Sequence, residues 1–476
     1  MSPSVELFNE AKYKALMDGL KCKEILLSDT YAATDYFRLE AEYYNSITVS
    51  YRRSLKGKDV ALNIQYGTSK FCDEQEDGYP VLRLNELHNA FIDTPQKYCH
   101  TLSPDEFEKL RLKKGDVLVI RTNGNPNLVG KAAVVLEDAD YAFASYLYRV
   151  NTNEQINPET LVAYLNCKYG RYEIDKNSIK GNQTNFSPAK FRDISIPKFD
   201  ITLQKTIKNL FCKAYQCRLN ADSEFVSAEQ MLISAIGFND FEPDTNNVAT
   251  KPFSESYAVT GRLDAEYYLP RYNSYVNKID TEETVGSTCS LNDKNYTPNN
   301  ETAYQYIELA DVGYFGNIGE VEKVLGKDLP SRARRQVKAG QIIVASVEGS
   351  LQSCALITDE YDNALCSTGF YVLDSKRINS ETLLVLFKSK PIQELLKQRC
   401  SGTILTAITK DELLDMPLPE IEAQAQLEIA KKVRESFALR NQSERLINLA
   451  KSVVEYAIEK DEAKAIKWLK EKGVDC

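Results

Sequence analysis

The sequence is poor in the residues that build metal centres and disulfide frameworks. It contains two histidines, His88 and His100, and its 11 cysteines include no C-x-x-C pair. Cys212 and Cys217 are the two that stand nearest along the chain. Zinc sites need clustered Cys and His ligands, and disulfide frameworks need regularly spaced cysteines in a secreted chain. We therefore expect no metal site, and free thiols in a reducing cytoplasm.

Long apolar runs are also missing. No stretch approaches the roughly 18 residues that a membrane-spanning helix requires. The first residues, MSPSVE, lack the basic and apolar regions of a signal peptide. The sequence predicts a cytoplasmic protein with no membrane partner.

Catalytic signatures are absent as well. The sequence contains no H-E-x-x-H, no G-x-S-x-G and no N-P-P-Y-type tetrapeptide of an amino-methyltransferase. Residues 124–131 (GNPNLVGK) resemble a phosphate loop, but one residue too many separates the glycines, and Ala132 replaces the Ser or Thr that binds Mg²⁺. A phosphate-loop enzyme would bind nucleotide measurably, and we expect no such binding. The sequence predicts a non-catalytic chain with no cofactor of its own.

The most informative feature that is present is an internal repeat. Three motifs recur in the same order at nearly the same separation. They are RLEAEYY at 38–44 and RLDAEYY at 262–268, KGDVLVI at 114–120 and AGQIIVA at 339–345, and ISIP at 194–197 and LDMP at 414–417. A unit of roughly 220 residues is far longer than the about 20–50 residues of a solenoid repeat. It predicts a duplicated domain followed by a helix, with pseudo-twofold symmetry.

Apolar periodicity divides the chain into β-rich and helical segments. Leu203, Ile207, Leu210 and Ala214 are spaced by three and four residues, as in a packed pair of helices, and a similar stripe recurs near the C-terminus. We expect an α+β fold in which two homologous β-rich domains are separated by two long antiparallel coiled-coil helices in a circular arrangement. The predicted segments are an N-terminal helix that completes the distal helical region (1–21), a first β-rich domain (22–200), a central long helix (201–237), a linker (238–256), a second β-rich domain (257–420), and a distal long helix with a tail (421–476).

The charge of the chain bears on whether it binds nucleic acid. A net charge of −9 argues against such binding, because phosphate contacts need Lys and Arg. Basic residues nevertheless gather locally, whereas much of the acid lies in the predicted helical tails. The basic clusters are Arg52 and Arg53 with Lys56, Lys113 with Lys114, and Arg332, Arg334 and Arg335 with Lys338. The average charge weakens a DNA-binding function without excluding it.

Several polar and aromatic motifs in the β-rich segments resemble those of a known family. In the first copy they are IQYGTSK at 64–70 and GYPVLR at 78–83. In the second copy they are YIEL at 306–309, LPSRARR at 329–335, KAGQIIVASV at 338–347 and MPLP at 416–419, followed by Glu422, Gln424 and Gln426. Together they resemble the specificity subunits of type I restriction–modification enzymes, and the resemblance covers essentially the whole chain.

This resemblance implies a function and partners. Each β-rich domain would be a target-recognition domain that reads one half of a bipartite site in double-stranded DNA through the major groove. The helices would set the spacing, since about 34 residues at 1.5 Å per residue rise roughly 50 Å. The implied partners are two adenine-methyltransferase (modification) subunits, which use S-adenosylmethionine, and in a full complex two motor–nuclease (restriction) subunits, which use ATP and Mg²⁺. The chain itself would be a non-catalytic recognition subunit.

Candidate DNA contacts follow from the side chains of the resembling loops. Arg and Lys suit guanine and phosphate, Asn and Gln suit adenine edges, and Ser and Thr suit the DNA backbone. The candidates in the first domain are Arg52, Arg53, Tyr66, Thr68, Ser69, Lys70, Arg83, Asn182, Gln183 and Asn185. Those in the second domain are Ser331, Arg332, Arg334, Arg335 and Lys338. The alternative for each is a solvated surface residue and, for Tyr66 and Arg83, a structural role.

Some charged residues recur in both copies. Arg38 and Glu42 return as Arg262 and Glu266. Because the two domains would read different sequences, we expect these residues to hold each domain together or dock it to the helices.

A second function stays open beside DNA recognition. The chain could be a scaffold or anti-restriction decoy that binds the methyltransferase without reading DNA. Such a decoy would have no basic loops, and the cluster at 332–338 argues against it.

Overall fold

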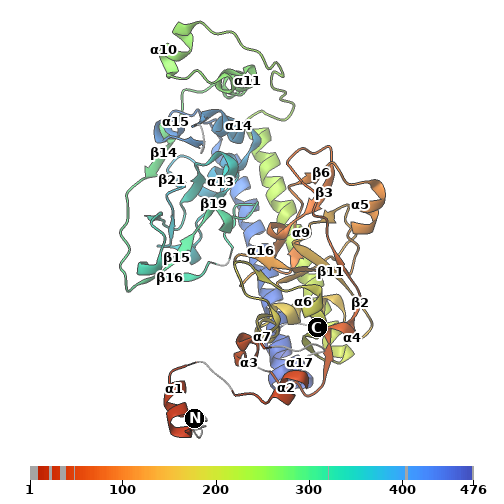
Figure 1. Cartoon of the computed structure of the whole chain (residues 1–476). Coiled ribbons are helices and arrows are strands. Elements are labelled where there is room, and N and C mark those ends of the chain that lie inside the picture. Colours follow the sequence, from red (N-terminus) through yellow and green to blue (C-terminus); the bar gives the residue numbers. More distant parts are fainter. Residues whose placement is uncertain are drawn as a thin grey trace. The chain divides into compact units, whose positions relative to one another are not determined.

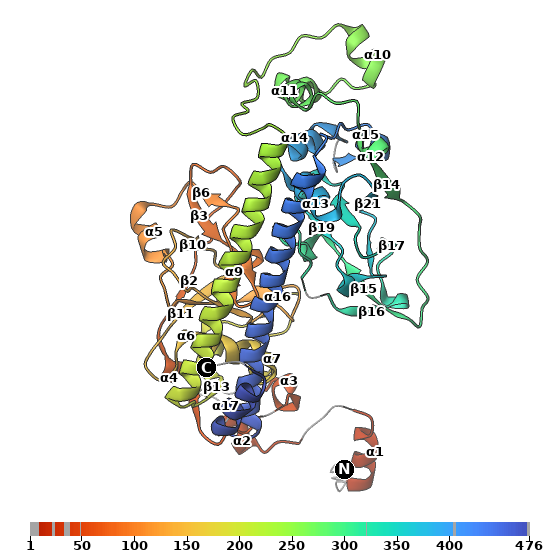
Figure 2. The ribbon, with the colours of Figure 1, turned by 180° about the vertical axis from the view of Figure 1, so that it is seen from behind.

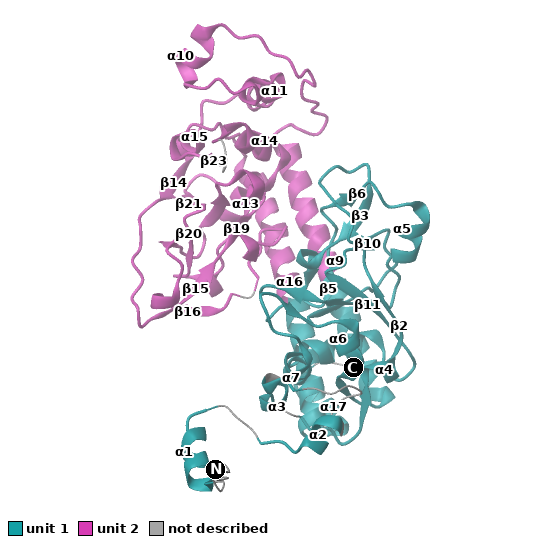
Figure 3. Cartoon of the chain, in the orientation of Figure 1, with its two compact units in different colours: residues 1–217, 442–476 teal, residues 218–441 magenta. Residues whose placement is uncertain are grey.

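The computed structural model describes residues 9–20, 24–32, 39–47, 49–319, 321–402 and 406–473. The chain divides into unit 1, which comprises Met1–Cys217 and Gln442–Cys476, and unit 2, which comprises Arg218–Asn441 (Figure 3). Two long helices, α9 (Ile201–Ala235) and α16 (Ala423–Glu459), belong to both units, each with one half. Strands and helices occur in both units, so the predicted α+β class with two long helices is confirmed.

Unit 1 is built on a six-stranded sheet in the order β2-β11-β7-β9-β5-β4. Figure 1 labels two of its strands, β2 and β11. Neighbouring strands are antiparallel except for the pair β5–β9. Strand β7 has the sequence VLVI and is buried along its whole length, because both faces of the sheet are covered there. The strands of this sheet are β2 (Ala61–Tyr66), β4 (Leu87–His88), β5 (Phe91–Ile92), β7 (Val117–Ile120), β9 (Ala132–Val134) and β11 (Leu147–Thr152). Smaller sheets comprise β1 (Ser54–Lys56) with β13 (Ser195–Pro197), β8 (Thr122–Asn123) with β12 (Thr184–Asn185), and β10 (Ala142–Phe143) with β3 (Tyr79–Leu82) and β6 (Tyr98–Cys99).

The helices of unit 1 begin at recognisable capping residues. Ser103, Asn157 and Ser187 each accept a hydrogen bond from an N–H of the first turn, and a proline follows each of them. The stretch from Pro158 to Asn177 forms two helices, which meet at the extended residue Cys167. The helices that lie wholly in unit 1 are α1 (Glu10–Met17), α2 (Leu27–Ala32), α3 (Ala41–Asn45), α4 (Gly57–Val60), α5 (Pro104–Leu110), α6 (Pro158–Asn166), α7 (Lys168–Asn177), α8 (Pro188–Asp193) and α17 (Glu462–Glu471).

Unit 2 has two four-stranded sheets, in the orders β14-β21-β18-β19 and β16-β15-β20-β17. Strand β18, with the sequence IIVA, is buried like its counterpart β7. The strands are β14 (Cys289–Asn292), β15 (Ala303–Ile307), β16 (Lys323–Leu325), β17 (Ala333–Gln336), β18 (Ile342–Ala345), β19 (Cys354–Leu356), β20 (Leu365–Ser367), β21 (Phe370–Ser375), β22 (Cys400–Ser401) and β23 (Ala407–Ile408). The helices are α10 (Tyr257–Thr260), α11 (Pro270–Ile279), α12 (Val285–Thr288), α13 (Ser380–Lys388), α14 (Lys390–Arg399) and α15 (Lys410–Leu414).

The repeat seen in the sequence is a repeat of structure. Gly115 and Gly340, just before β7 and β18, have φ angles of +92° and +87°, which favour glycine. The Gly115 N–H donates to the carbonyl of Val135 (2.8 Å), and the Gly340 N–H donates to that of Ile357 (2.9 Å). The same turn therefore feeds the same buried strand in both units.

One of the sequence alignments is wrong by two residues. The sequence pairs Ile194 with Leu414. In the structure the carbonyl of Ile194 accepts from the N–H of Gly57 (3.0 Å), and the equivalent carbonyl, which accepts from Val285 (2.9 Å), is that of Met416. The motif MPLP of the second copy contains two prolines, whereas ISIP of the first copy contains one. The sequence alignment pairs that single proline with the first proline of MPLP, although the second is its structural equivalent.

A polar clamp joins each β-rich domain to the long helix that follows it. In unit 1 the N–H of Asn157 donates to the side-chain carbonyl of Gln204 (2.8 Å), and the Asn157 amide donates to the backbone carbonyl of Gln204 (2.9 Å). In unit 2 Asn379 makes the same two bonds to Gln426, both at 3.0 Å. Each asparagine also caps its own helix, α6 or α13, by accepting from a threonine N–H at 2.8 Å. Two helices of each unit are thus held by one pair of side chains.

Apolar stripes hold the long helices together within each unit. Figure 2 shows α9 and α16 side by side. In unit 1 the predicted stripe of α9 shares one core with buried residues 447, 450, 453 and 454 of α16. In unit 2 the second half of α9 shares a core with the first half of α16. There Lys432 pairs with Glu224 (2.6 Å) and the Ser436 hydroxyl donates to the carbonyl of Ala221 (2.7 Å). Along α16 the residue number rises from 432 to 436 while that of the partner in α9 falls from 224 to 221, so the two helices are antiparallel here.

The predicted role of residues 1–21 stays a prediction. Residues 1–8 and residue 21 lie outside the described part of the chain, and helix α1 buries none of its residues. The circular arrangement and the predicted domain boundaries likewise stay predictions.

Replacing Gln204 with Ala should loosen unit 1 locally, because it leaves the N–H of Asn157 and the carbonyls of Gln155 and Phe199 without their side-chain partner, although the bond from the Asn157 amide to the backbone carbonyl of residue 204 remains. A buried hydrogen-bonding group left unpaired costs about 1–3 kcal/mol, so the amides of α6 should exchange roughly five- to a hundredfold faster. Native-state hydrogen exchange of the full chain would measure this, with α13 of unit 2 as the internal reference. Gln424→Ala is the matched control. Gln424 lies in the first turn of α16, and its exposed side chain donates to Glu428 of that helix (2.8 Å). Equal acceleration in α6 and α13 would contradict the prediction.

Candidate nucleic-acid interface

A cation stacks on an aromatic ring at the end of strand β2. The guanidinium carbon of Arg121 lies 5.4 Å from the centre of the Tyr66 ring, within the range of a cation–π interaction. Tyr66 ends β2 and stands opposite Tyr148 of β11, and Arg121 directly follows β7. Tyr66 is 47% exposed. The pair therefore lies at the surface, where strands of the large sheet end.

Hydrogen bonds fix the backbone of Arg121 on both sides. Its N–H donates to the carbonyl of Tyr146 (2.8 Å), and its own carbonyl accepts from the N–H of Phe186 (2.8 Å). Tyr146 is half exposed, whereas Phe186 is fully buried. The buried phenylalanine thus anchors a backbone that carries exposed groups.

Two of the predicted amides lie beside this pair. Strand β8 begins with Thr122, the residue after Arg121, and Thr122 stands opposite Asn185 in β12. The Thr122 hydroxyl is 3.5 Å from the side-chain oxygen of Gln183. Asn182 precedes them in an exposed bend. We call the following set the strand-end site of unit 1: Tyr66, Arg121, Thr122, Tyr146, Gln183 and Asn185.

The same backbone frame recurs in unit 2 with other side chains. Ser346 takes the place of Arg121: its N–H donates to the carbonyl of Gly369 (2.9 Å), and its carbonyl accepts from the N–H of Ile408 (2.8 Å). Gly369 therefore occupies the position of Tyr146. A serine and a glycine offer neither the charge nor the ring, so the two units cannot make the same contacts there.

In unit 2 the cations at this edge come from other elements. Asp293 directly follows β14, at the position that corresponds to Tyr66. Lys410, in the first turn of α15, forms an ion pair with Asp293 (2.5 Å). Arg335 of β17 donates to the side chain of Asn295 (3.2 Å) and to the carbonyl of Asp293. The strand-end site of unit 2 comprises Asp293, Asn295, Arg335, Ser346 and Lys410.

The other predicted residues of unit 2 do not gather at this site. Arg332 forms an exposed ion pair with Glu308 (3.0 Å), and Arg334 donates to the carbonyl of Ser331 (3.0 Å). Lys338 belongs to the turn before β18, whereas the strand-end site follows that strand. One of the five predicted residues, Arg335, is thus part of the strand-end site.

Two of the predicted cations of unit 1, Lys70 and Arg83, are occupied within the protein. Lys70 bonds Glu106 (2.6 Å) and the carbonyl of Thr101 (2.8 Å). The Lys70 ammonium, followed by hydrogen bonds from Ser103, lowers the pKa of Glu106 to about 2. Arg83 caps a short helix together with Glu86, with its N–H 2.7 Å from the Glu86 carboxylate.

The remaining predicted residues of unit 1 shape backbone or lie elsewhere. Thr68 accepts from the N–H of Lys70 (3.1 Å) and donates its own N–H to the carbonyl of Phe143 (2.8 Å), while Ser69 is exposed. Arg52 and Arg53 precede β1, near the acidic start of α17. Their predicted contacts with DNA stay predictions.

The recurring arginine of the second copy has structural contacts. Arg262 donates to the carbonyl of Cys400 (2.7 Å), which ties the segment before α11 to the end of α14. Glu266 pairs with a different arginine. Arg38 and the side chain of Glu42 lie outside the described part of the chain.

Arg121, Tyr146 and Lys410 are absent from the contacts that the sequence predicts. A signal for Arg121 is available: it is the first residue after the repeated strand, where the two copies stop matching and the second has Ser346. For Lys410 the signal is a lysine in the first turn of a helix, where the helix dipole disfavours a cation.

An acidic loop follows the predicted contact residues 68–70. The ring of His100 lies 2.9 Å from a carboxylate oxygen of Asp73 and 3.0 Å from one of Asp77. The hydrogen bond to Asp73 raises the pKa of His100, and the same bond lowers the pKa of Asp73. This negative charge disfavours a phosphate at the loop, unlike the strand-end sites, where cations are exposed.

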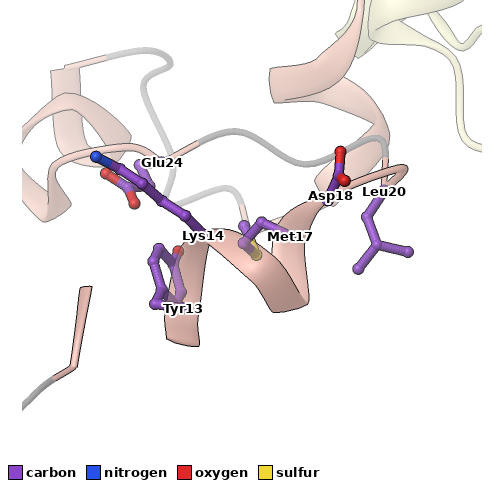
Figure 4. Close-up of a pocket in the computed structure, with 6 residues that line it drawn as sticks. All are labelled: Tyr13, Lys14, Met17, Asp18, Leu20 and Glu24. Carbon is purple, nitrogen blue, oxygen red and sulfur yellow. The ribbon is translucent and has the colours of Figure 1, made fainter. Parts of the chain in front are cut away.

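A small hollow near the N-terminus is a different kind of feature (Figure 4). Its volume is about 320 Å³, and it is lined by Tyr13, Lys14, Met17, Asp18, Leu20 and Glu24. These side chains include no histidine, serine or cysteine. Within the described ranges, no three His, Cys, Asp or Glu side chains are placed to share a metal ion. No described helix is long and apolar enough to cross a bilayer.

Comparisons with known proteins support the resemblance seen in the sequence. No protein-family model matches the chain. Over 135 residues it is 24% identical to the type I restriction enzyme StySPI specificity subunit of Salmonella potsdam, a match that covers 28% of each protein. The chain is similar to a type I specificity subunit. Because the match spans little more than a quarter of that relative, its activity and partners do not transfer directly.

Solved structures of the same class align over most of the chain at low similarity. The type I restriction–modification S subunit of M. genitalium is 13% identical, with a TM-score of 0.36 over 87% of this chain and 96% of that one. The HsdS subunit of Thermoanaerobacter tengcongensis is 14% identical, with a TM-score of 0.28 over 86% and 97%. Scores this low say nothing about how the two units are arranged.

Protonation of His100 should make the β3–β6 edge of unit 1 pH-dependent. Because its folded pKa is raised, its contribution to stability is fully present below its ordinary pKa of 6.5 and is lost as the pH rises through the raised value. Because the folded pKa of Asp73 is lowered, the contribution of Asp73 to stability is present above its ordinary pKa of 3.8 and is lost as the pH falls through the lowered value. The hydrogen-bonded amides of Asp73 and Tyr98 should therefore be most protected between these two pH values.

Hydrogen exchange of these two amides, corrected for intrinsic rates, measures the effect. His100→Ala should remove the pH dependence, and His88→Ala, which changes the other histidine, should keep it. Protection that does not change through the neutral range in the native chain would refute this role of His100.

Proposed function

We propose that this chain is the DNA sequence-specificity subunit of a type I restriction–modification complex. The observation that carries the proposal is the duplicated backbone frame of the strand-end sites, on which the units display different side chains. Arg121 on Tyr66 in unit 1 is replaced by Ser346 beside Arg335 and Lys410 in unit 2. Two copies of one frame with different exposed groups suit the recognition of two different sequences.

The chemistry of both sites suits the edges of base pairs. Arg, Asn and Gln form paired hydrogen bonds with guanine or adenine in the major groove, and lysine also meets guanine and phosphate. Unit 1 offers Arg121 with Gln183 and Asn185, and unit 2 offers Arg335 with Lys410. Each unit would read one half of a bipartite site.

The long helices would set the distance between the half-sites. Helix α9 has 35 residues. At 1.5 Å per residue it rises about 52 Å, which exceeds the roughly 34–36 Å of one helical turn of DNA and so would keep two half-sites apart along the duplex. The clamps at Gln204 and Gln426 would fix each recognition domain to its end of this spacer.

The chain would recognise DNA while other subunits perform the chemistry. It would recruit two adenine-methyltransferase subunits through its helices and domains, and a full complex would add two motor–nuclease subunits. Such a complex would explain how a chain with a net charge of −9 takes part in DNA binding, since much of the affinity for DNA would come from the assembled complex. S-Adenosylmethionine, ATP and Mg²⁺ would be bound by those partners.

The second candidate function is a scaffold or decoy that binds the methyltransferase without reading DNA. The observation against it is that basic side chains lie at the strand-end sites of both units: Arg121 on Tyr66 in unit 1, and Arg335 with the ion-paired Lys410 in unit 2. A decoy needs a docking surface for the enzyme but no cations at this edge.

A single-molecule methylome tests the function directly. Cells that express the neighbouring methyltransferase gene with this chain should show a new split motif, consisting of two short half-sites around a fixed gap. The same cells without the chain provide the baseline. An unchanged methylome, with the chain still bound to the methyltransferase, would favour the decoy.

Domain exchange then assigns the half-sites. Replacing residues 22–200 with the equivalent domain of another specificity subunit should change one half-site and leave the other and the gap intact. The donor should keep an asparagine at the position of Asn157, so that the clamp with Gln204 survives. The matched exchange of residues 257–420 should change the other half-site. If either exchange alters both half-sites, the units do not read independently.

A further inference from the structure

Arg121 is a cation without a carboxylate partner. Its side chain forms no ion pair with any residue that the structure describes, and its Nε is buried without a hydrogen-bond acceptor. Arg149, in the adjacent strand β11, pairs with Asp116 at 3.0 Å and bonds the carbonyl of Arg111 (2.8 Å). The Nε of Arg149 is also buried without an acceptor, so the two arginines differ in charge pairing: Arg149 has a carboxylate partner, and Arg121 has none among the described residues.

An unsatisfied, half-buried guanidinium is costly to the free protein. Burying an N–H without an acceptor sacrifices hydrogen bonds to water, and a charge loses more than a neutral group. The ring of Tyr66 offsets part of this loss through its negative face. The other N–H groups of the Arg121 guanidinium have no hydrogen-bond acceptor among the described residues.

The arginine is also held in place before any ligand arrives. Its backbone is bonded on both sides, to Tyr146 and Phe186, and its guanidinium rests on Tyr66. Tyr66 is fixed in turn by the pairing of β2 with β11. A planar, five-donor group that is already oriented loses little entropy when it meets two acceptors.

We propose that Arg121 reads a base that presents two hydrogen-bond acceptors in the major groove, the pattern of guanine O6 and N7, and that Tyr66 is its positioning residue. This inference rests on the proposed function and names one contact within it. Because Ser346 replaces Arg121 in unit 2, the contact belongs to the half-site of unit 1 alone. Arg121 would therefore specify one position of one half-site.

The test is the methylome of the complete complex with Arg121→Ala. The preferred base at one position of one half-site should become degenerate, with its preference over the other bases falling roughly ten- to a hundredfold. The other half-site and the gap should not change. Arg192→Ala is the matched control: it removes an exposed arginine of the same unit from helix α8, outside the strand-end site, and should leave the whole motif intact.

The role of Tyr66 needs a pair of variants. Tyr66→Phe keeps the ring and should preserve the base preference, whereas Tyr66→Ala removes the stack and should relax the same position as Arg121→Ala. A merely structural role for Tyr66 would lower methylation at all sites and would not change the preference at that one position.

The outcomes separate this inference from the function on which it rests. Absence of any split motif with the native chain refutes the proposed function itself. A native motif that Arg121→Ala leaves unchanged refutes the inference and leaves the function standing. A uniform loss of methylation that does not depend on the base also refutes it, because that pattern marks a phosphate contact. If Arg121→Ala does not fold, as judged by hydrogen exchange of β7, Arg121→Lys takes its place and should weaken the same single preference.

Discussion

The polar clamp between Asn157 and Gln204, repeated by Asn379 and Gln426, is the interaction on which the architecture of each unit depends. It joins the first turn of a long helix to the cap of the helix that covers the sheet. A purely apolar contact would allow the helix to slide or rotate, whereas two hydrogen bonds with defined directions allow one register. A spacer helix can set a distance only if each end is fixed in this way.

Duplication explains how one frame serves two recognition surfaces. The turns at Gly115 and Gly340, the buried strands β7 and β18, and the clamps are the same in both units. These parts are constrained by buried hydrogen bonds and by packing. The residue immediately after the strand, Arg121 or Ser346, has no such constraint beyond its backbone, and its side chain is where the copies differ.

Local charge matters more here than the total. Lys70 and Arg332 are both predicted DNA contacts, yet each is paired with a carboxylate of its own unit. Such exposed pairs contribute little to stability, but they reduce the field that a phosphate would meet. Among the residues that the structure describes, Arg121 has no such partner, and it becomes prominent only once the fold places it on Tyr66. An acidic chain can therefore still carry basic recognition sites.

By itself the sequence determined the α+β class, the duplication and the two long apolar stripes. These features follow from local periodicity and from motifs that repeat along the chain, and periodicity is a property of neighbouring residues. It also identified Tyr66, Gln183, Asn185 and Arg335 as residues of the candidate site. It misaligned Ile194 with Leu414, because two prolines competed for one match.

Only the tertiary structure decided which residues meet. Tyr66, Arg121 and Tyr146 come from three separate stretches, and they converge because the sheet order places β2 and β7 on either side of β11. That order is set by long-range strand pairing and by burial of the VLVI strand, which no local pattern encodes. For the same reason the sequence could not show that Lys70 is already bonded to Glu106. Which cations remain available to DNA is decided by which carboxylates the fold brings beside them.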